Sequence, residues 1–168
     1  MRFIDSHLHL ADYPSPDGPV GFARGAGGLL VSCGTDKASS EETLRLARTS
    51  GGVVRAFVGV HPSEAEGETE WVRATLRVAS GLGEVGMDPK YSEVGRRSRQ
   101  LSVLEAQLEA AQELRKPVEV HSRGAENECL DVLEGFRLHG VLLHWFASEE
   151  LLGEAARRGY FEIGRAHV

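Results

Sequence analysis

The stretch SRQLSVLEAQLEAAQELRKPVEVH, residues 98–121, joins a helix and a strand in one unit. Its leucines and alanines recur at intervals of three and four from Leu101 to Leu114, which is the spacing of one face of an amphipathic helix. Pro117 ends this helix, because proline lacks the amide hydrogen that a helix interior needs, and the apolar residues that follow are typical of a buried strand. The stretch therefore predicts one helix–strand step of an α/β fold.

The same alternation extends along the rest of the chain. Short apolar runs separated by longer amphipathic segments are typical of βα units that carry a parallel sheet. Further helices are expected at the apolar stripes around Leu44, Trp71, Cys129 and Leu151. The expected strands cover residues 2–6, 28–33, 53–59, 82–86, 117–121, 139–144 and 160–163. These seven strands predict a parallel sheet within one domain, residues 1–168.

Two local signals refine this interpretation. Ser39 followed by Glu42 resembles a capping box, which predicts where the helix around Leu44 begins. Residues 13–28 are rich in proline and glycine, and they are expected to form a loop with at most one helical turn, near residues 20–24.

Composition limits the class of protein. The 168 residues are 41 % hydrophobic and contain no apolar run of the ~18 residues that a membrane span needs. We expect a cytoplasmic protein without a signal peptide, in which Cys33 and Cys129 are buried free thiols. The net charge of -6 argues against a protein that coats nucleic acid with a broad basic surface, so a phosphate substrate would need a local positive site.

Two histidines follow each other at the end of the first expected strand. Because His7 and His9 are two residues apart, their side chains face the same side of a strand and can approach one metal ion. The pair alone leaves an exposed, unrelated role open. Glu84 lies in an apolar, glycine-rich strand, where an unpaired carboxylate would be costly to bury, and this position indicates a nearby cation.

His121 and His144 each close another apolar strand. One such histidine is most often a hydrogen-bonded core residue, but the carboxyl ends of barrel strands converge on a shared mouth where active sites are built. Four histidines and one glutamate at four strand ends therefore predict a metal centre. The set is large for one ion, and we expect two divalent ions (Zn, Mg or Mn) roughly 3.5 to 4 Å apart, bridged by Glu84.

Other residues at strand ends have two open interpretations each. His61 and Arg123 can contact an anionic group or have ordinary solvated roles. Trp145 can stack on a base or form an apolar wall. Asp88 can turn the chain or orient a histidine. His139 and His167 are expected to have no part in the site.

Five segments, in order, resemble the TatD family of metal-dependent deoxyribonucleases. They are residues 5–10 (DSHLHL), 59–62 (GVHP), 83–88 (GEVGMD), 117–125 (PVEVHSRGA) and 142–146 (LLHWF). The resemblance implies a TIM-type (β/α) barrel that holds one or two divalent metals and hydrolyses phosphodiesters in DNA. It also implies the residue roles. His7 and His9 would hold one metal and His121 and His144 the other, with Glu84 as the bridge. From their own positions at strand ends, His61 and Arg123 are expected to act on the substrate together with Glu84, and Trp145 is expected to contact it.

The chain departs from the family pattern at two places. Ala147-Ser148 stands where the family usually continues with Ser-Gly, and the chain ends at Val168, before the Glu-Thr-Asp segment that carries a further ligand. The resemblance therefore implies an incomplete barrel, with about seven of eight strands and without the last βα unit. Such an open barrel would leave strand edges that can self-associate with another chain.

Three functions fit these residues. The first is a deoxyribonuclease in which a metal-activated water attacks a DNA phosphodiester. The second is a metallohydrolase acting on a lactone, an amide or a phosphotriester, since the same metal pair suits these substrates and fold does not decide between them. The third is a truncated, non-catalytic protein that binds metal or self-associates.

Overall fold

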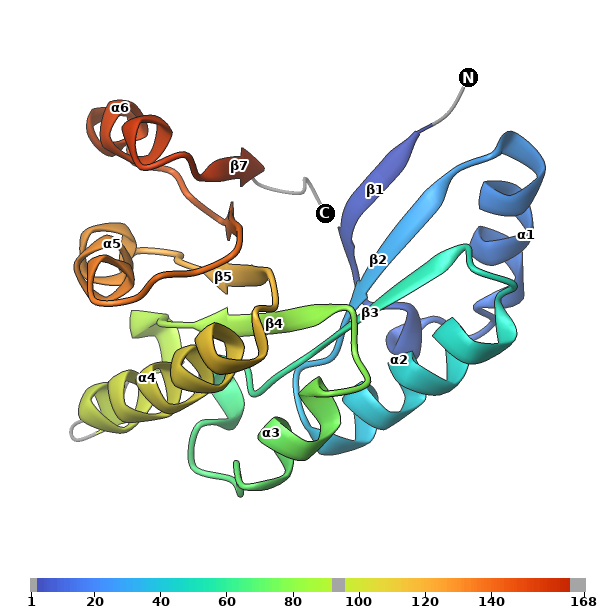
Figure 1. Cartoon of the computed structure of the whole chain (residues 1–168), viewed down its shortest axis with the longest axis horizontal. Coiled ribbons are helices and arrows are strands. Elements are labelled where there is room, and N and C mark those ends of the chain that lie inside the picture. The colour runs from blue at the N-terminus through green and yellow to red at the C-terminus, as the bar shows by residue number, and fades with distance from the viewer. Residues whose placement is uncertain (1–2, 92–95, 164–168) are drawn as a thin grey trace.

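The computed structural model describes residues 3–91 and 96–163, and its strands form one parallel sheet in which each strand pairs with the next along the chain (Figure 1). The strands are β1 (Ile4–Leu8), β2 (Leu29–Cys33), β3 (Val54–Val58), β4 (Gly81–Gly86), β5 (Val118–His121), β6 (Val141–His144) and β7 (Phe161–Ile163). All seven predicted strands are confirmed. The first begins and ends two residues later than expected, so that His7 belongs to the strand itself.

Six α-helices are found in the described ranges, one between each two consecutive strands, and Figure 1 shows them on the outer side of a curved sheet. They are α1 (Asp17–Ala26), α2 (Lys37–Thr49), α3 (Trp71–Leu76), α4 (Arg96–Leu114), α5 (Glu126–Glu134) and α6 (Glu149–Arg157). Short 3₁₀ turns are η1 (Leu10–Asp12), η2 (Pro62–Glu64) and η3 (Pro89–Tyr91). None of the described helices combines the length and the hydropathy of a bilayer-crossing segment.

Contacts across the inside of the sheet show how strongly it curls. The rings of His7 on β1 and His144 on β6 stack with centroids 3.8 Å apart, although four strands lie between β1 and β6 in the sheet order. Glu119 on β5 also contacts His7. Because a flat sheet would hold these side chains far apart, the seven strands of the described residues form a curled, open sheet of the predicted TIM-barrel type. Self-association through β1 and β7, at the two ends of the sheet, stays a prediction.

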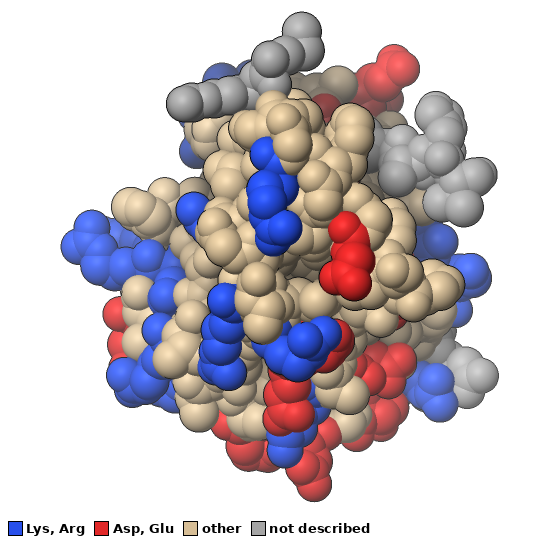
Figure 2. Space-filling view, turned by 90° about the vertical axis from the view of Figure 1, so that its right-hand side faces the viewer, with Lys and Arg blue, Asp and Glu red and all other residues tan. Residues whose placement is uncertain are grey.

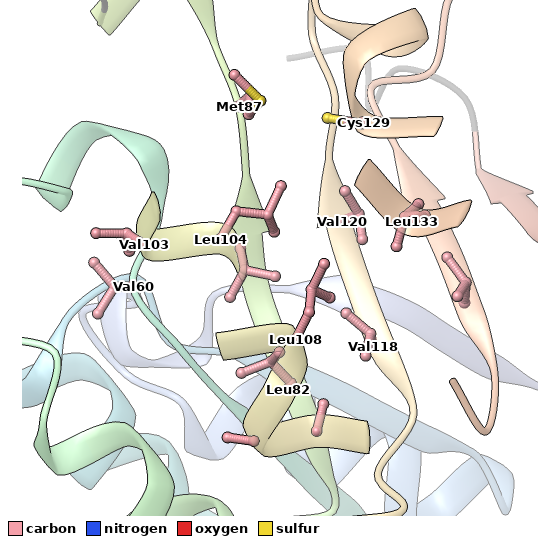
Figure 3. Packing of buried hydrophobic residues seen from close by; sticks show 14 of the residues in the cluster. Val60, Leu82, Met87, Val103, Leu104, Leu108, Val118, Val120, Cys129 and Leu133 are labelled. Atoms are coloured by element: carbon pink, nitrogen blue, oxygen red, sulfur yellow. The ribbon is translucent and has the colours of Figure 1, made fainter. Parts of the chain in front are cut away.

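The main core lies between the sheet and the outer helices (Figure 3). Val118 and Val120 of β5 pack there together with Leu104 and Leu108 of α4 and with Cys129 of α5. Since side chains alternate along a strand, the neighbours of the two valines, residues 119 and 121, face the inside of the barrel. The prediction that Cys33 and Cys129 are buried free thiols is confirmed.

An irregularity in β4 turns Glu84 toward the inside. Leu82 and Val85 both belong to the main core, although strict alternation would put residues three apart on opposite faces. The pairing register with β5 shifts between these two residues, as it does at a β-bulge. This shift lets Glu84 face the inside of the barrel, while Leu82 and Val85 both pack outward into the main core.

The expected loop over residues 13–28 is wrong, because residues 17–26 form helix α1. Pro19 lies in the first turn, where the missing amide hydrogen leaves no helical bond unmade. Val20 and Ala23 are buried in a second core cluster together with Leu30 of β2. Packing of this face therefore outweighs the poor helix propensity of the glycines.

The predicted capping box is also placed wrongly. Helix α2 begins at Lys37, its N-cap is Asp36, and Ser39 is the third helical residue rather than the cap. The Asp36 carboxylate accepts the Ser39 amide hydrogen at 2.8 Å, and the Ser39 hydroxyl oxygen accepts the Asp36 amide hydrogen at 3.0 Å. Glu42 instead pairs with Arg45 on the exposed face of the helix.

Replacing Asp36 with Ala is expected to lower the free energy of unfolding by about 1 kcal/mol, because the first turn of α2 loses its cap. The hydrogen bonds from Ser39 lower the pKa of Asp36. The stabilisation by the Asp36 cap is therefore complete above the pKa that Asp36 has in the unfolded chain. It is lost as the pH falls through the pKa that Asp36 has in the folded protein. Urea unfolding at neutral and at acidic pH measures both effects.

Ser148→Ala is the matched control, since Ser148 caps α6 without a side-chain hydrogen bond to that helix. Equal losses in the two variants, or a loss in Asp36→Ala that does not shrink in acid, would contradict the cap assignment.

Candidate metal centre

One cavity of about 840 Å³ gathers the predicted site residues at the carboxyl ends of the strands. Its lining includes His7, His9, His61, Glu84, His121, Arg123, His144 and Trp145. His139 is exposed outside the cavity, and His167 lies outside the described residues. The structure therefore brings together all eight residues on which the sequence interpretation depends.

Glu84 is the centre of this arrangement. Its Oε2 atom lies 3.2 Å from Nε2 of His9 and 3.9 Å from Nε2 of His7. Its Oε1 atom lies 2.6 Å from Nδ1 of His121 and 3.7 Å from Nε2 of His144. Each carboxylate oxygen thus faces a different pair of histidines.

The protonation states suit metal binding. Burial acts to raise the pKa of Glu84, but the hydrogen bonds with His121 and His9 outweigh it and hold this pKa well below its usual range, so the carboxylate is an anion at neutral pH. Burial lowers the pKa of His144 to about 3 and that of His61 to about 4. Both rings are therefore uncharged near neutral pH, the state in which imidazole binds a metal.

The donor set fits divalent ions. Ligand atoms of His7, His9 and Glu84 lie within 4.8 Å of one another, and so do those of His61, Glu84 and His121. Imidazole nitrogens combined with a carboxylate are typical ligands of zinc and related ions. In the described part of the chain, Nδ1 of His144 is buried without a hydrogen-bond partner, while Nε2 of the same ring faces Glu84.

Asp88 performs both of the functions that the sequence left open. Its Oδ1 atom accepts the Lys90 amide hydrogen at 2.8 Å, which shapes the turn after β4. Its Oδ2 atom lies 2.8 Å from Nε2 of His121 and accepts a hydrogen bond from Arg123 Nε at 2.8 Å. An acceptor at Nε2 leaves Nδ1 of His121 as the nitrogen that faces Glu84.

Arg123 lies at the mouth of the cavity between two aromatic rings. Its guanidinium carbon is 5.6 Å from the ring centroid of Tyr91 and 5.3 Å from that of Trp145. Trp145 has a left-handed backbone, with φ of 56°, which is unfavourable for a bulky residue and is often found at functional sites. Tyr91 was not among the predicted site residues, because a single tyrosine two residues after a proline carries no sequence signal of its own.

On the face drawn in Figure 2, acidic and basic side chains are interspersed, in keeping with the net charge of -6. Among the described residues that line the cavity, Arg123 is the only arginine or lysine.

A second buried glutamate was also missed. Glu119 is fully buried, and its carboxylate contacts Nδ1 of His7 and the Cys33 thiol. The signal that singled out Glu84, a carboxylate inside an apolar strand, applies equally to Glu119 and would have found it.

Comparison with known proteins gives consistent results. The sequence profile described as TatD related DNase matches residues 4–164. The chain is 29 % identical to "Putative deoxyribonuclease tatdn3" of Danio rerio, over 88 % of this chain and 63 % of that protein. It is 28 % identical to "Deoxyribonuclease TATDN3" of Homo sapiens, over 96 % and 67 %. It is 35 % identical to "3'-5' ssDNA/RNA exonuclease TatD" of Erwinia billingiae, over 83 % and 56 %. The chain thus spans about two thirds or less of the length of these relatives.

Solved structures share the fold. The TatD homologue YJJV of Escherichia coli superposes with a TM-score of 0.80 at 23 % identity, over 95 % of this chain and 66 % of that one. A TatD family hydrolase of Entamoeba histolytica superposes with a TM-score of 0.74 at 16 % identity, over 95 % and 64 %. At these identities the likeness concerns the barrel alone.

Proposed function

Because this chain belongs to the TatD-related DNase family, we propose that it is a metal-dependent hydrolase that cleaves phosphodiester bonds in DNA. One observation carries the proposal: the two oxygens of Glu84 face two separate pairs of histidines. His7 and His9 would hold one divalent ion and His121 and His144 a second, with Glu84 between them. When bound, two such ions supply a hydroxide nucleophile at neutral pH and stabilise negative charge on a phosphoryl oxygen.

His61 is assigned to the substrate by its hydrogen bonds. The Ser63 amide donates to Nδ1 of His61 at 3.1 Å, so the ring hydrogen of the neutral imidazole is on Nε2. A protonated Nε2 donates a hydrogen bond and does not bind a metal. We therefore propose that His61 donates a hydrogen bond to a phosphoryl oxygen of the substrate. Its position near Glu84 and His121 would also allow it to bind a metal, but its proposed hydrogen on Nε2 argues against that role.

Arg123 supplies the charge for the phosphate. Its hydrogen bond with Asp88 and its place between two aromatic rings fix the guanidinium at the cavity mouth, where it can stabilise the negative charge of the scissile group. Trp145, with Tyr91 opposite, offers a flat surface on which a nucleic-acid base can stack.

The buried, unpaired state of Cys33 and Cys129 supports a cytoplasmic location, where thiols stay reduced.

Metal removal and a substrate panel test this function. The purified protein is stripped with a chelator, reloaded with Zn²⁺, Mn²⁺ or Mg²⁺, and assayed for bound ions and for cleavage of a labelled DNA oligonucleotide. We expect up to two ions per chain and cleavage that disappears on stripping and returns on reloading. Metal-loaded protein that hydrolyses a lactone, an amide or a phosphotriester but not DNA would favour the second class of hydrolase. Bound metal with no hydrolysis at all would favour a non-catalytic protein.

A further inference from the structure

Glu119 lies inside the barrel, directly beneath the histidines of the cavity. It is two residues before His121 on β5 and is 0 % exposed, among otherwise apolar strand residues. Its Oε1 atom contacts Nδ1 of His7, and its Oε2 atom accepts a hydrogen bond from the Cys33 thiol at 3.0 Å. Both oxygens of a buried carboxylate are therefore engaged, and one of them by a residue of the proposed metal centre.

An ordinary packing role does not account for this residue. Burying a carboxylate is costly even when it is paired, and an apolar side chain would fill the same space without that cost. The benefit must come from what the carboxylate does to its neighbours. Of these, His7 is the one whose other ring nitrogen faces Glu84.

His9 shows the same geometry with a different acceptor. Its Nδ1 atom donates to the Cys33 carbonyl oxygen at 2.9 Å, and its Nε2 atom faces Glu84 Oε2. In both histidines, then, Nδ1 is bound to the barrel wall and Nε2 faces the same carboxylate oxygen. Cys33 contributes to both arrangements. Its carbonyl oxygen accepts the hydrogen bond from His9, and its thiol donates to Glu119, which in turn contacts His7.

We propose that Glu119 is a positioning residue that accepts the Nδ1 hydrogen of His7, so that the lone pair on Nε2 points at the metal position beside Glu84. A carboxylate in this place fixes the tautomer and the ring orientation of a ligating histidine and increases its basicity. The inference rests on the proposed function for the presence of a metal, but the tautomer of His7 exists without one.

One other role is open to the same carboxylate. Ligand atoms of His7, Glu119 and His144 lie within 4.8 Å of one another, so Glu119 could itself be a ligand. The hydrogen-bond contact of Glu119 with Nδ1 of His7 favours the positioning role, since Nε2 of the same ring is the nitrogen that faces Glu84. The number of bound ions in variants of Glu119 separates the two roles.

The first experiment needs no variant. In the metal-free protein, long-range ¹H–¹⁵N correlation spectra report which ring nitrogen of His7 carries the hydrogen, with the resonances assigned through the loss of signals in His7→Gln. We expect the hydrogen on Nδ1 and a lone pair on Nε2. A hydrogen on Nε2 would overturn the proposal, whatever the protein does to DNA.

The second experiment titrates Co²⁺, followed by its visible absorption, into wild type, Glu119→Leu and Glu119→Gln. Leucine removes the acceptor, and we expect affinity for the first ion to fall about 10- to 100-fold. Glutamine keeps an acceptor for the Nδ1 hydrogen without the charge, so its affinity is expected between those of wild type and Glu119→Leu. All three proteins are expected to bind the same number of ions at saturation.

Thr43→Val is the matched control, because Thr43 is a fully buried polar residue whose hydroxyl lies 3.4 Å from that of Ser32 and which does not line the cavity. It is expected to leave Co²⁺ affinity unchanged. Loss of one ion in Glu119→Gln would identify Glu119 as a ligand, and wild-type affinity in Glu119→Leu would show that it does not position His7. Either result overturns the proposal. Failure of the wild type to cleave DNA would instead count against the proposed function alone.

Discussion

The Glu84→Gln protein is expected to lose DNA cleavage by about 1000-fold or more, since a bridging ligand contributes several kcal/mol to the transition state and each ~1.4 kcal/mol is tenfold in rate. Glutamine has the same size, so the variant changes charge with little change in packing. The neutral amide cannot offset the charge of a second ion, and we expect at most one ion to remain bound. Metal content and initial rates of oligonucleotide cleavage measure the two effects.

Glu42→Gln is the control for this experiment. Glu42 is a partly exposed glutamate that pairs with Arg45 on α2, outside the cavity. Its replacement is expected to leave metal content and cleavage unchanged. A Glu84→Gln protein that keeps both the wild-type ion content and the wild-type rate would refute the assignment of Glu84 as the bridge, and circular dichroism would show whether the fold is retained.

The Gly86→Ala protein is expected to be less stable than wild type by about 3 kcal/mol or more, from overpacking combined with backbone strain. Gly86 has φ of 150°, a conformation that side chains rarely adopt. A Cβ atom at this position would lie 1.9 Å from the carbonyl oxygen of His121, far inside any real contact. Because that obstacle is backbone, β4 and β5 would have to separate, and His121 would move away from Glu84.

The measurements are the midpoint of thermal unfolding and Co²⁺ affinity, both of which should fall. Gly21→Ala, on α1, is the matched control, since its added methyl group meets no atom within 4 Å. In a helix interior this change is expected to raise the free energy of unfolding by roughly 0.5 to 1 kcal/mol. Wild-type stability in Gly86→Ala would show that β4 and β5 do not approach each other as described.

The fold was predictable because its signals are local. Most strands are short, largely apolar runs, and Pro117 marks the change from helix to strand in the stretch that ends at His121. The errors arose where a local signal was outweighed. The glycines of α1 argue against a helix, but burial of Val20 and Ala23 stabilises one. Ser39 is a good cap by residue type, yet Asp36 reaches the first-turn amide hydrogen and makes the cap.

The sequence was enough to predict which residues form the site, but not which of their atoms contact one another. The carboxyl ends of parallel strands meet, so His7, Glu84 and His121 could be placed together from sequence. Which nitrogen of His121 faces Glu84 depends on Asp88, and that contact follows from the turn after β4. The contact between Glu119 and His7 depends on how far the sheet curls, because it joins β5 to β1 across the barrel. No pattern in a single strand contains that information.

The stacked rings of His7 and His144 also bear on how the protein comes to be folded. These residues lie near opposite ends of the described chain, and their rings meet only after every intervening strand has paired and the sheet has curled. Pairing between distant segments is the slow part of folding. A bound ion stabilises only conformations that bind it. An ion held by His7, His9 and Glu84 is therefore expected to bind late in folding, after β1 has reached β4, whereas Glu84, His121 and His144 lie on three neighbouring strands.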